Sequence, residues 1–151
     1  MRAGVDPRTG LEELDQEECL RLVRGSTLGR LGIVIAGQPM VFPVNFTLDG
    51  RAVILRTDEG TKLHAARHGR VAFECDGIDP LYHTGWSVVI MGHAEQVTQP
   101  SDVARLLRLP LGPWCPGAKP VWLRIRPGTI TGRRIPQHGM YPPESREGME
   151  S

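Results

Sequence analysis

The sequence has few aromatic residues, few cysteines and almost no excess charge, and each shortage excludes a class of protein. Aromatic side chains make up 5% of the 151 residues, so the stacking platforms that bind single-stranded nucleic acids are scarce. Three cysteines with no close pair do not form a disulfide framework and predict a reducing, cytoplasmic location. A formal net charge of +1 argues against nucleic-acid or membrane-surface partners bound through bulk charge.

Long hydrophobic runs are also missing. No stretch is long and apolar enough to span a membrane, and the first 25 residues are acidic rather than apolar, so we expect neither a signal peptide nor a membrane partner. The length fits one domain. We expect a flexible leader at 1–10, a folded domain at 11–135 and a flexible tail at 136–151.

Alternating apolar residues dominate the middle of the chain and predict a mainly β protein with three short helices, near 15–24, 61–68 and 101–109. Asp15 and Glu18 have the spacing of a capping box at the start of the first helix. Six to seven strands are expected, at 28–35, 40–47, 52–57, 71–76, 86–97, 121–126 and 129–135. Most connections have hairpin length, so the sheet should be antiparallel and close into a small barrel.

Three short signals add detail to this sheet. Asp49-Gly50 is a strong hairpin signal. Pro43 has no N–H to give to a ladder, so its strand should lie at an edge or contain a bulge. Gly92 interrupts a long apolar strand, as expected where a strand bends round a barrel corner.

A small barrel fills its own interior with side chains. A ligand must then bind outside the barrel, in a groove at its wall or between two copies of the chain. This reasoning already favours a homodimer with a small-molecule substrate.

One segment combines several groups that bind phosphate. Arg56 and Thr57 end a predicted strand, Gly60 allows a close turn, and Thr61 is placed to cap the next helix. Lys62, one of only two lysines, lies in the first turn of that helix, where a cation is disfavoured unless an anion is present. A guanidinium, a hydroxyl, an ammonium and a helix N-terminus would converge there, and together they form a phosphate site.

The same residues also fit a plainer interpretation, in which Thr61 caps a surface helix and the charges are solvated. The segment lacks the glycines of a P-loop or a dinucleotide-binding turn. His64 and His68 have a spacing that can bind zinc, but no third ligand is close in sequence, so no metal site is expected.

Several motifs in this order resemble the pyridoxamine 5′-phosphate oxidase-like family of flavin-binding split barrels, in particular its small actinobacterial members. The motifs are Arg30-Leu31-Gly32, Phe42-Pro43-Val44-Asn45-Phe46, Leu55-Arg56-Thr57, Gly60-Thr61-Lys62-Leu63, Val71-Ala72-Phe73-Glu74, Gly85-Trp86-Ser87-Val88-Val89 and Gly92-His93-Ala94.

The resemblance implies a homodimeric split barrel that holds FMN, or a related deazaflavin, in a groove between subunits. The implied activity is that of a flavin-dependent oxidoreductase acting on a small organic substrate. The alternatives are a deazaflavin-dependent reductase and a flavin- or haem-binding protein without turnover.

Positions matching the family's motifs give a candidate set of cofactor-binding residues. Lys62 and Thr61 would hold the phosphate, with Arg56 and Thr57 beside it. The other members are Pro43, Val44 and Asn45 along the ring, mostly through backbone groups; Leu55 and Leu63; Trp86 and Ser87 from an adjacent strand or the partner; and Trp122 and Arg124 across the dimer.

The sequence departs from true pyridoxamine 5′-phosphate oxidases near its C-terminus. Those enzymes have an arginine-x-histidine pair for the substrate phosphate, whereas here Arg133-Arg134 is followed only at a distance by His138. A pyridoxine vitamer is therefore not the expected substrate. No general acid or base stands out, so no catalytic residue is named.

Overall fold

The computed structural model describes residues 4–60, 64, 66, 69–111 and 121–137. The strands of this part are β1 (Glu12–Leu14), β2 (Leu28–Ile35), β3 (Gln38–Asn45), β4 (Thr47–Asp49), β5 (Ala52–Thr57), β6 (Arg70–Asp79), β7 (Thr84–Val97) and β8 (Val121–Ile135). Its helices are α1 (Gln16–Arg24) and α3 (Pro100–Leu106). The helix expected at 61–68 lies largely outside the described residues.

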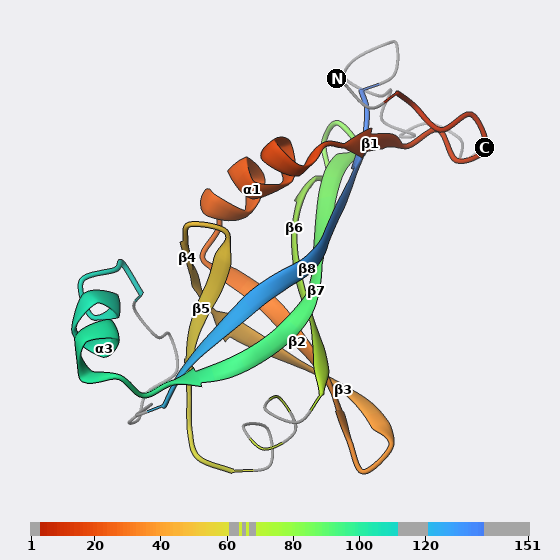
Figure 1. Ribbon diagram of the computed structural model, residues 1–151. Helices are drawn as coiled ribbons and strands as arrows, with labels where there is room; N and C mark the ends of the chain where they lie inside the picture. Colours follow the sequence, from red (N-terminus) through yellow and green to blue (C-terminus); the bar gives the residue numbers. More distant parts are fainter. Residues whose placement is uncertain (1–3, 61–63, 65, 67–68, 112–120, 138–151) are drawn as a thin grey trace, which may run out of the picture.

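All eight strands belong to one antiparallel sheet, in the order β3-β2-β6-β7-β8-β5-β4, with β1 paired to the far end of β8. The sheet curls strongly (Figure 1), so β3 and β5 come into contact although they share no ladder. This seam between unpaired strands makes the barrel a split one. The expected mainly β, antiparallel split barrel is therefore confirmed.

The number of strands differs from the prediction of six to seven for two reasons. β1 and β4 have three residues each, too few for an alternating pattern to be recognised. The two strands expected at 121–126 and 129–135 are one continuous strand of 15 residues. Pro127 and Gly128 do not interrupt it, because β7 shifts its register between Met91 and Gly92 and follows β8 past them.

Gly92 lies where the backbones of β7 and β8 approach each other closely. A Cβ atom at this position would overlap the carbonyl oxygen of Arg126, so no larger residue fits without moving the backbone. β7 also shifts its register on β8 between Met91 and Gly92, so the irregularity expected at this glycine is present.

The predicted hairpin at Asp49-Gly50 is also confirmed. Asp49 pairs with Ala52 across a two-residue turn, and Gly50 has a positive φ of 60°. This turn fixes the register of β5, and therefore the position of the residues that end it.

β3 is an edge strand, as Pro43 predicted. Residues 39, 41 and 43 are alternate residues of β3, so all three have the same relation to the hydrogen bonds between β3 and β2. Residues 39 and 43 are prolines. Because proline cannot bond to β2 through its nitrogen, the backbone groups at all three positions point away from β2. Two of these three positions have no N–H, which discourages another strand from adding to this edge.

The core fills the inside of the curled sheet, with Leu31, Phe73, Ile90 and Leu123 all fully buried. Helix α1 closes one end through Cys19 and Val23. The helix begins as its sequence predicts, because the Asp15 side chain accepts a hydrogen bond from the backbone N–H of Glu18 at 2.9 Å.

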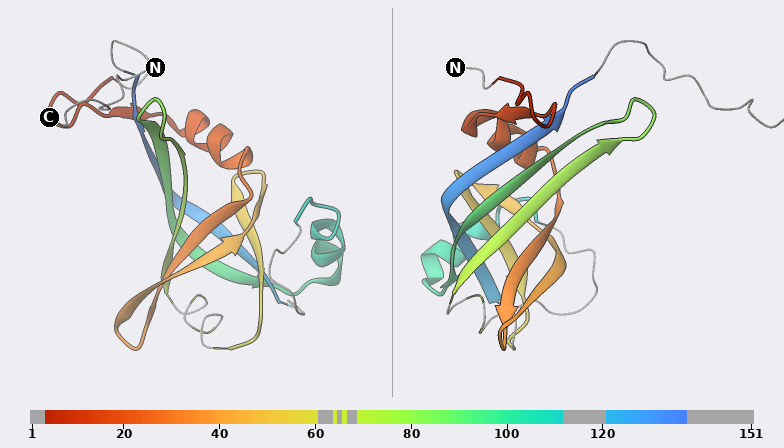
Figure 2. Two further views of the ribbon diagram at one scale, coloured as in Figure 1. Left: turned by 180° about the vertical axis from the view of Figure 1, so that it is seen from behind. Right: turned by 90° about the vertical axis from the view of Figure 1, so that its right-hand side faces the viewer.

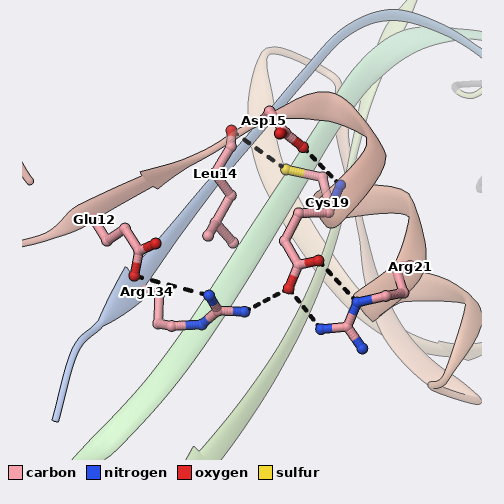
Figure 3. Close-up of polar contacts among 7 residues, drawn as sticks. Glu12, Leu14, Asp15, Cys19, Arg21 and Arg134 are labelled. Atoms are coloured by element: carbon pink, nitrogen blue, oxygen red, sulfur yellow. Dashed lines mark hydrogen bonds and ion pairs between the residues drawn. The ribbon is translucent and has the colours of Figure 1, made fainter. Parts of the chain in front are cut away.

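An arginine on β8 fastens α1 to the sheet (Figure 3). Arg134 donates to Glu18 at 2.7 Å and lies 3.8 Å from a carboxylate oxygen of Glu12. Hydrogen bonds from Arg21 and then from Arg134 lower the pKa of Glu18 to about 2. Strand β1, helix α1 and strand β8 are thus tied together by ion pairs and charge-assisted hydrogen bonds.

Helix α3 covers the outside of the barrel at the other end of β8. Its Leu106 packs with Ile54, Val97 and Trp122 in a second, smaller apolar cluster. Arg105 donates to Asp49 at 2.8 Å and holds the helix against the hairpin. In the described part of the chain, no helix is long and apolar enough to span a membrane.

Candidate functional site

Two consecutive residues at the end of β5 have buried polar atoms with no hydrogen-bond partner among the described residues. These atoms are Nε of Arg56 and Oγ1 of Thr57, and Thr57 is only 1% exposed. A buried polar group without a partner costs about 1–3 kcal/mol. Such groups are rare in folded proteins and often mark a position where something else binds.

Arg56 and Thr57 point to opposite sides of the sheet because successive strand residues alternate. Thr57 lies on the core side, with the buried Val53 and Leu55. Arg56 lies on the outer side, directly opposite Trp122 of β8. Its guanidinium carbon is 4.7 Å from the centroid of the Trp122 ring, a cation–π arrangement.

Arg124 lies on the same outer face, two residues beyond Trp122. Its guanidinium donates to Glu95 of β7 at 3.2 Å, and Arg126 donates to the same carboxylate at 2.8 Å. Burial opposes ionisation of Glu95, but the bonds from Arg126 and Arg124 outweigh it and lower the pKa of this carboxyl. The structure therefore brings together Arg56, Trp122 and Arg124, and Arg124 is already paired.

The residues expected beside the flavin ring lie on edge strand β3. Pro43 is exposed and faces outward, whereas Val44 is 7% exposed and points into the core. Leu55 is also fully buried in the core. Val44 and Leu55 can therefore contact a bound molecule only through backbone atoms. Asn45 lies on the outer side and its side chain reaches the carbonyl oxygen of Thr27, with a long separation of 3.4 Å.

Trp86 and Ser87 lie far from Arg56 within one chain. Trp86 pairs with Arg134 near the end of β8, whereas Trp122 is the second residue of that strand. Twelve residues of extended strand separate the two positions, which is roughly 40 Å along the chain. A single copy of the chain does not bring Trp86 and Ser87 to the Arg56 site.

Three further residues of the candidate set, Thr61, Lys62 and Leu63, lie outside the described residues. Just before them, Gly60 has a φ of 149°, and its carbonyl oxygen accepts a hydrogen bond from the N–H of His64 at 3.0 Å. The role of Lys62 and Thr61 in binding phosphate therefore stays a prediction.

The motif-based prediction missed a cleft of about 580 Å³ on the outer face of the sheet. It lies between the β2–β3 hairpin and the bend in β7 and β8, and its lining is mostly apolar. Three glycines in its lining, at positions 32, 92 and 128, are the only sequence signal for it. Within the described ranges, no group of three or more His, Cys, Asp or Glu side chains could hold a metal ion.

Comparison with known proteins places this geometry in a family. The family model described as pyridoxamine 5′-phosphate oxidase matches residues 15–134. The uncharacterised protein Rv0080 of Mycobacterium tuberculosis is 39% identical over 141 residues, covering 89% of this chain and 91% of the relative. The chain belongs to the pyridoxamine 5′-phosphate oxidase-like family.

Solved structures of related proteins agree with this family assignment. An FAD-binding protein of Mycobacterium smegmatis is 38% identical, with a TM-score of 0.69 over 81% of this chain and 96% of the other. A candidate pyridoxamine 5′-phosphate oxidase of Corynebacterium glutamicum is 36% identical, with a TM-score of 0.73 over 82% and 97% of the two chains. The resemblance inferred from the motifs is therefore confirmed.

The family match includes every residue of the candidate set, from Pro43 to Arg124. Of the described members of that set, Arg56 and Thr57 have orphaned buried donors. A flavin phosphate is an acceptor of the kind these donors lack, so the residues present fit the cofactor that the family suggests.

Proposed function

We propose that this chain binds a flavin through its terminal phosphate at the end of β5 and acts as a flavin-dependent oxidoreductase on a small organic substrate. The observation that carries the proposal is the Nε of Arg56, a buried donor without a partner on the outer face of β5. Thr57 ends the same strand with its Oγ1 unpartnered on the core side, and would reach the same anion only past the end of the strand. The fold would otherwise bear the cost of leaving both without a partner.

The chemistry of these two groups favours an anion. A guanidinium has five N–H donors and no acceptor, and a threonine hydroxyl can donate one further bond. Trp122 supports one face of the Arg56 guanidinium at 4.7 Å and restricts its orientation. In the proposal, Thr61 and Lys62 add a helix N-terminus and an ammonium to the same anion.

We infer FMN as the flavin because its terminal phosphate monoester has close to two negative charges, which suits a site with two cationic side chains. The relatives known to bind FAD make that nucleotide the direct competitor. A deazaflavin is the third possibility and is distinguished by its spectrum.

In the proposal, the flavin ring lies along the outer edge of β3, beside Pro43 and Asn45. The backbone at positions 41 and 43 points away from β2, so its polar groups face the seam between β3 and β5. Peptide groups in this position can bond to the polar edge of a flavin ring.

A second copy of the chain completes the proposed site. Trp86 and Ser87 are too far along β8 to reach the flavin of their own copy, so they can contribute only from a partner. The groove for the flavin would then lie between two subunits.

A bound flavin supplies the electron transfer itself, and the protein supplies binding, orientation and electrostatics. For this reason the proposal does not depend on a general acid or base. Arg56 and Lys62 would hold the phosphate, and the β3 edge would fix the position of the ring.

The test is the absorbance spectrum of the purified full chain, followed by titration of the flavin-free protein with FMN, FAD and a deazaflavin. We expect saturable binding that is tightest for FMN. Oxidation of a reduced nicotinamide by the loaded protein then separates an oxidoreductase from a carrier. A colourless protein that binds none of the three flavins would contradict the proposal.

A further inference from the structure

The cleft of about 580 Å³ on the outer face of the sheet has no part in the proposed function. The strands that form it, β3, β2, β6, β7 and β8, are neighbours in the sheet (Figure 2). Arg56 lies on β5, on the other side of β8. Sites for small molecules have volumes of about 300–1,000 Å³. The cleft is therefore a second candidate site, separate from the one at Arg56.

The floor of the cleft is a row of residues that face one another across four strands. Gly32 of β2 pairs with Ala72 of β6, Ala72 with Met91 of β7, and Met91 with Thr129 of β8. A Cβ atom at Gly32 would be in ordinary contact with the Cβ of Ala72, at 3.5 Å, so the local backbone does not require this glycine. Glycine weakens the interior of a strand and often marks the close approach of a ligand. The missing side chain at Gly32 therefore points to an occupant of the space above it.

The wall on one side is the β2–β3 hairpin, which projects from the rest of the sheet (orange in Figure 2, left). Val34 and Val41 of this hairpin are 59% and 67% exposed, and Met91 on the floor is 49% exposed. Single exposed apolar side chains are normal, but these three line one concave site. An apolar molecule in the cleft would remove their surface from water, which is worth about 25 cal/mol per Å².

Two polar side chains without a partner lie at the edge of this apolar site. Arg70, the first residue of β6, is directly opposite His93 of β7, and both are exposed residues of the lining. Neither side chain has a hydrogen bond or ion pair in the part of the chain that the structure describes. A guanidinium has five N–H donors and no acceptor, and an imidazole has at least one N–H. The group that binds both should therefore be an acceptor.

No carboxylate of the chain is placed to be that acceptor. Among the described residues that line the cleft, none is Asp or Glu. Glu95 follows His93 on the same face of β7, but it already accepts a hydrogen bond from Arg126 at 2.8 Å. Arg126 in turn faces His93 across the β7–β8 ladder. The cleft thus has donors along one edge and an apolar floor, with no acidic side chain to pair with Arg70.

We propose that this cleft binds a small organic acid, a molecule with a flat apolar body and one carboxylate. The apolar body lies over Gly32, between Met91 and the β2–β3 hairpin, and the carboxylate accepts hydrogen bonds from Arg70 and His93. Arginine suits a carboxylate because its planar fork can donate two parallel bonds. One guanidinium and one imidazole, without a helix N-terminus, suit a single negative charge better than a phosphate. This inference does not rest on the proposed function.

A matched pair of probes tests the site. 2-Naphthoate and 2-naphthamide have the same apolar ring and nearly the same shape, and only the first is charged. Calorimetric titration of the flavin-free full chain should show naphthoate binding about 10-fold or more tightly than naphthamide, as expected for a hydrogen bond to a charged group. Arg70→Met should reduce this preference to less than 3-fold. The control is Arg108→Met, at an exposed arginine that does not line the cleft, and it should retain the preference.

A second variant places the bound probe in the cleft. Gly32→Val fills the space above the floor, so it should weaken both probes by about 10-fold or more while its circular dichroism stays that of the wild type. Arg70 is exposed, so Arg70→Met tests the carboxylate contact with little risk to the fold. Equal affinities of the wild-type protein for the two probes, or binding of neither, would overturn the inference. Unchanged naphthoate binding by Gly32→Val would overturn it as well.

Titration with FMN distinguishes this inference from the proposed function. Saturating FMN should leave the affinity for naphthoate within 3-fold of its value without flavin. Arg56→Met should lose FMN and retain naphthoate, and Arg70→Met should do the reverse. Displacement of naphthoate by FMN would overturn a separate site, because the flavin would then occupy the cleft. A wild-type protein that binds naphthoate but no flavin would reject the proposed function and support the acid site.

Discussion

The Arg56 guanidinium is held against the indole of Trp122, directly across the β5–β8 ladder, with 4.7 Å between the guanidinium carbon and the ring centroid. The indole is itself fixed, because it packs with Leu106 of α3 in the outer apolar cluster. The cation is thus positioned before any anion arrives, and its Nε has no partner in the described part of the chain. Such preorganisation lowers the entropy cost of binding.

Replacing Thr57 by valine should affect stability and binding in opposite directions. Valine has nearly the shape of threonine but no hydroxyl, so the flavin-free protein should keep its stability or gain up to about 1 kcal/mol. FMN affinity should fall by about 1 kcal/mol, since one hydrogen bond to the phosphate is lost. Urea unfolding of the flavin-free protein and FMN titration measure the two effects, and a flavin-free variant that is clearly less stable would argue that Oγ1 has a partner.

Trp122→Leu should weaken FMN binding although the side chain need not touch the cofactor. Loss of the cation–π contact releases Arg56 and should cost about 0.5–2 kcal/mol of affinity. The smaller side chain also leaves a cavity under α3, with a loss of about 2–4 kcal/mol in stability. Trp122→Phe is the matched control, because it retains an aromatic face and should restore most of the affinity. Equal FMN binding by the leucine variant would remove the role given to Trp122.

Gly92→Ala should be strongly destabilising. The added Cβ meets the carbonyl oxygen of Arg126, and relief requires the β7–β8 ladder to move. We expect a loss of about 2–4 kcal/mol, within the range for overpacking and backbone strain. Gly32→Ala adds the same atom in ordinary van der Waals contact with Ala72, at 3.5 Å from its Cβ, and should change stability by less than about 1 kcal/mol. Chemical denaturation of both variants compares them, and equal effects would contradict the close approach at Gly92.

Glu74 should make stability depend on pH near neutrality. Burial, a hydrogen bond with Asp76 and the negative charge of Asp76 raise the pKa of Glu74 from about 4.5 to about 7, although Arg30 acts in the other direction. The folded chain then keeps a proton that the unfolded chain loses. The free energy of unfolding should therefore fall as pH rises from about 4.5 to about 7, and level off above that.

The size of this effect is limited because about a third of the Glu74 side chain is exposed. We expect about 1–2 kcal/mol between pH 5 and pH 8. Glu74→Gln should flatten the profile and be more stable than the wild type at pH 8. Urea unfolding at fixed protein concentration measures this, and a wild-type protein that grows more stable over the same range would refute it. Glu18, with a pKa of about 2, acts only at more acidic pH.

Features that depend on neighbouring residues were predictable from the sequence. The Asp49-Gly50 turn, the Asp15 cap and the edge position of Pro43 each follow from a few adjacent residues, and all three are present. The merging of two expected strands at Pro127 was not predictable, because it depends on how β7 shifts at Gly92, far away in the sequence.

The candidate site shows the same distinction. Arg56 and Thr57 were predicted as site residues from their local motif. The burial that leaves their donor atoms without a hydrogen-bond partner comes from strands and a helix that are distant in the sequence. Trp86 and Trp122 are both strand residues in the motif-based set, and only the long register of β7 on β8 shows that they lie at opposite ends.

Comparison of FMN with riboflavin, which lacks the phosphate, tests the phosphate site at Arg56 most directly. Calorimetric titration of the flavin-free full chain should show FMN binding at least 100-fold more tightly than riboflavin. In Arg56→Met that preference should shrink by 10-fold or more, while Arg24→Met, a control at an exposed arginine of α1, should retain it. Equal affinities for the two flavins in the wild-type protein, or an unchanged preference in Arg56→Met, would contradict a phosphate held by Arg56.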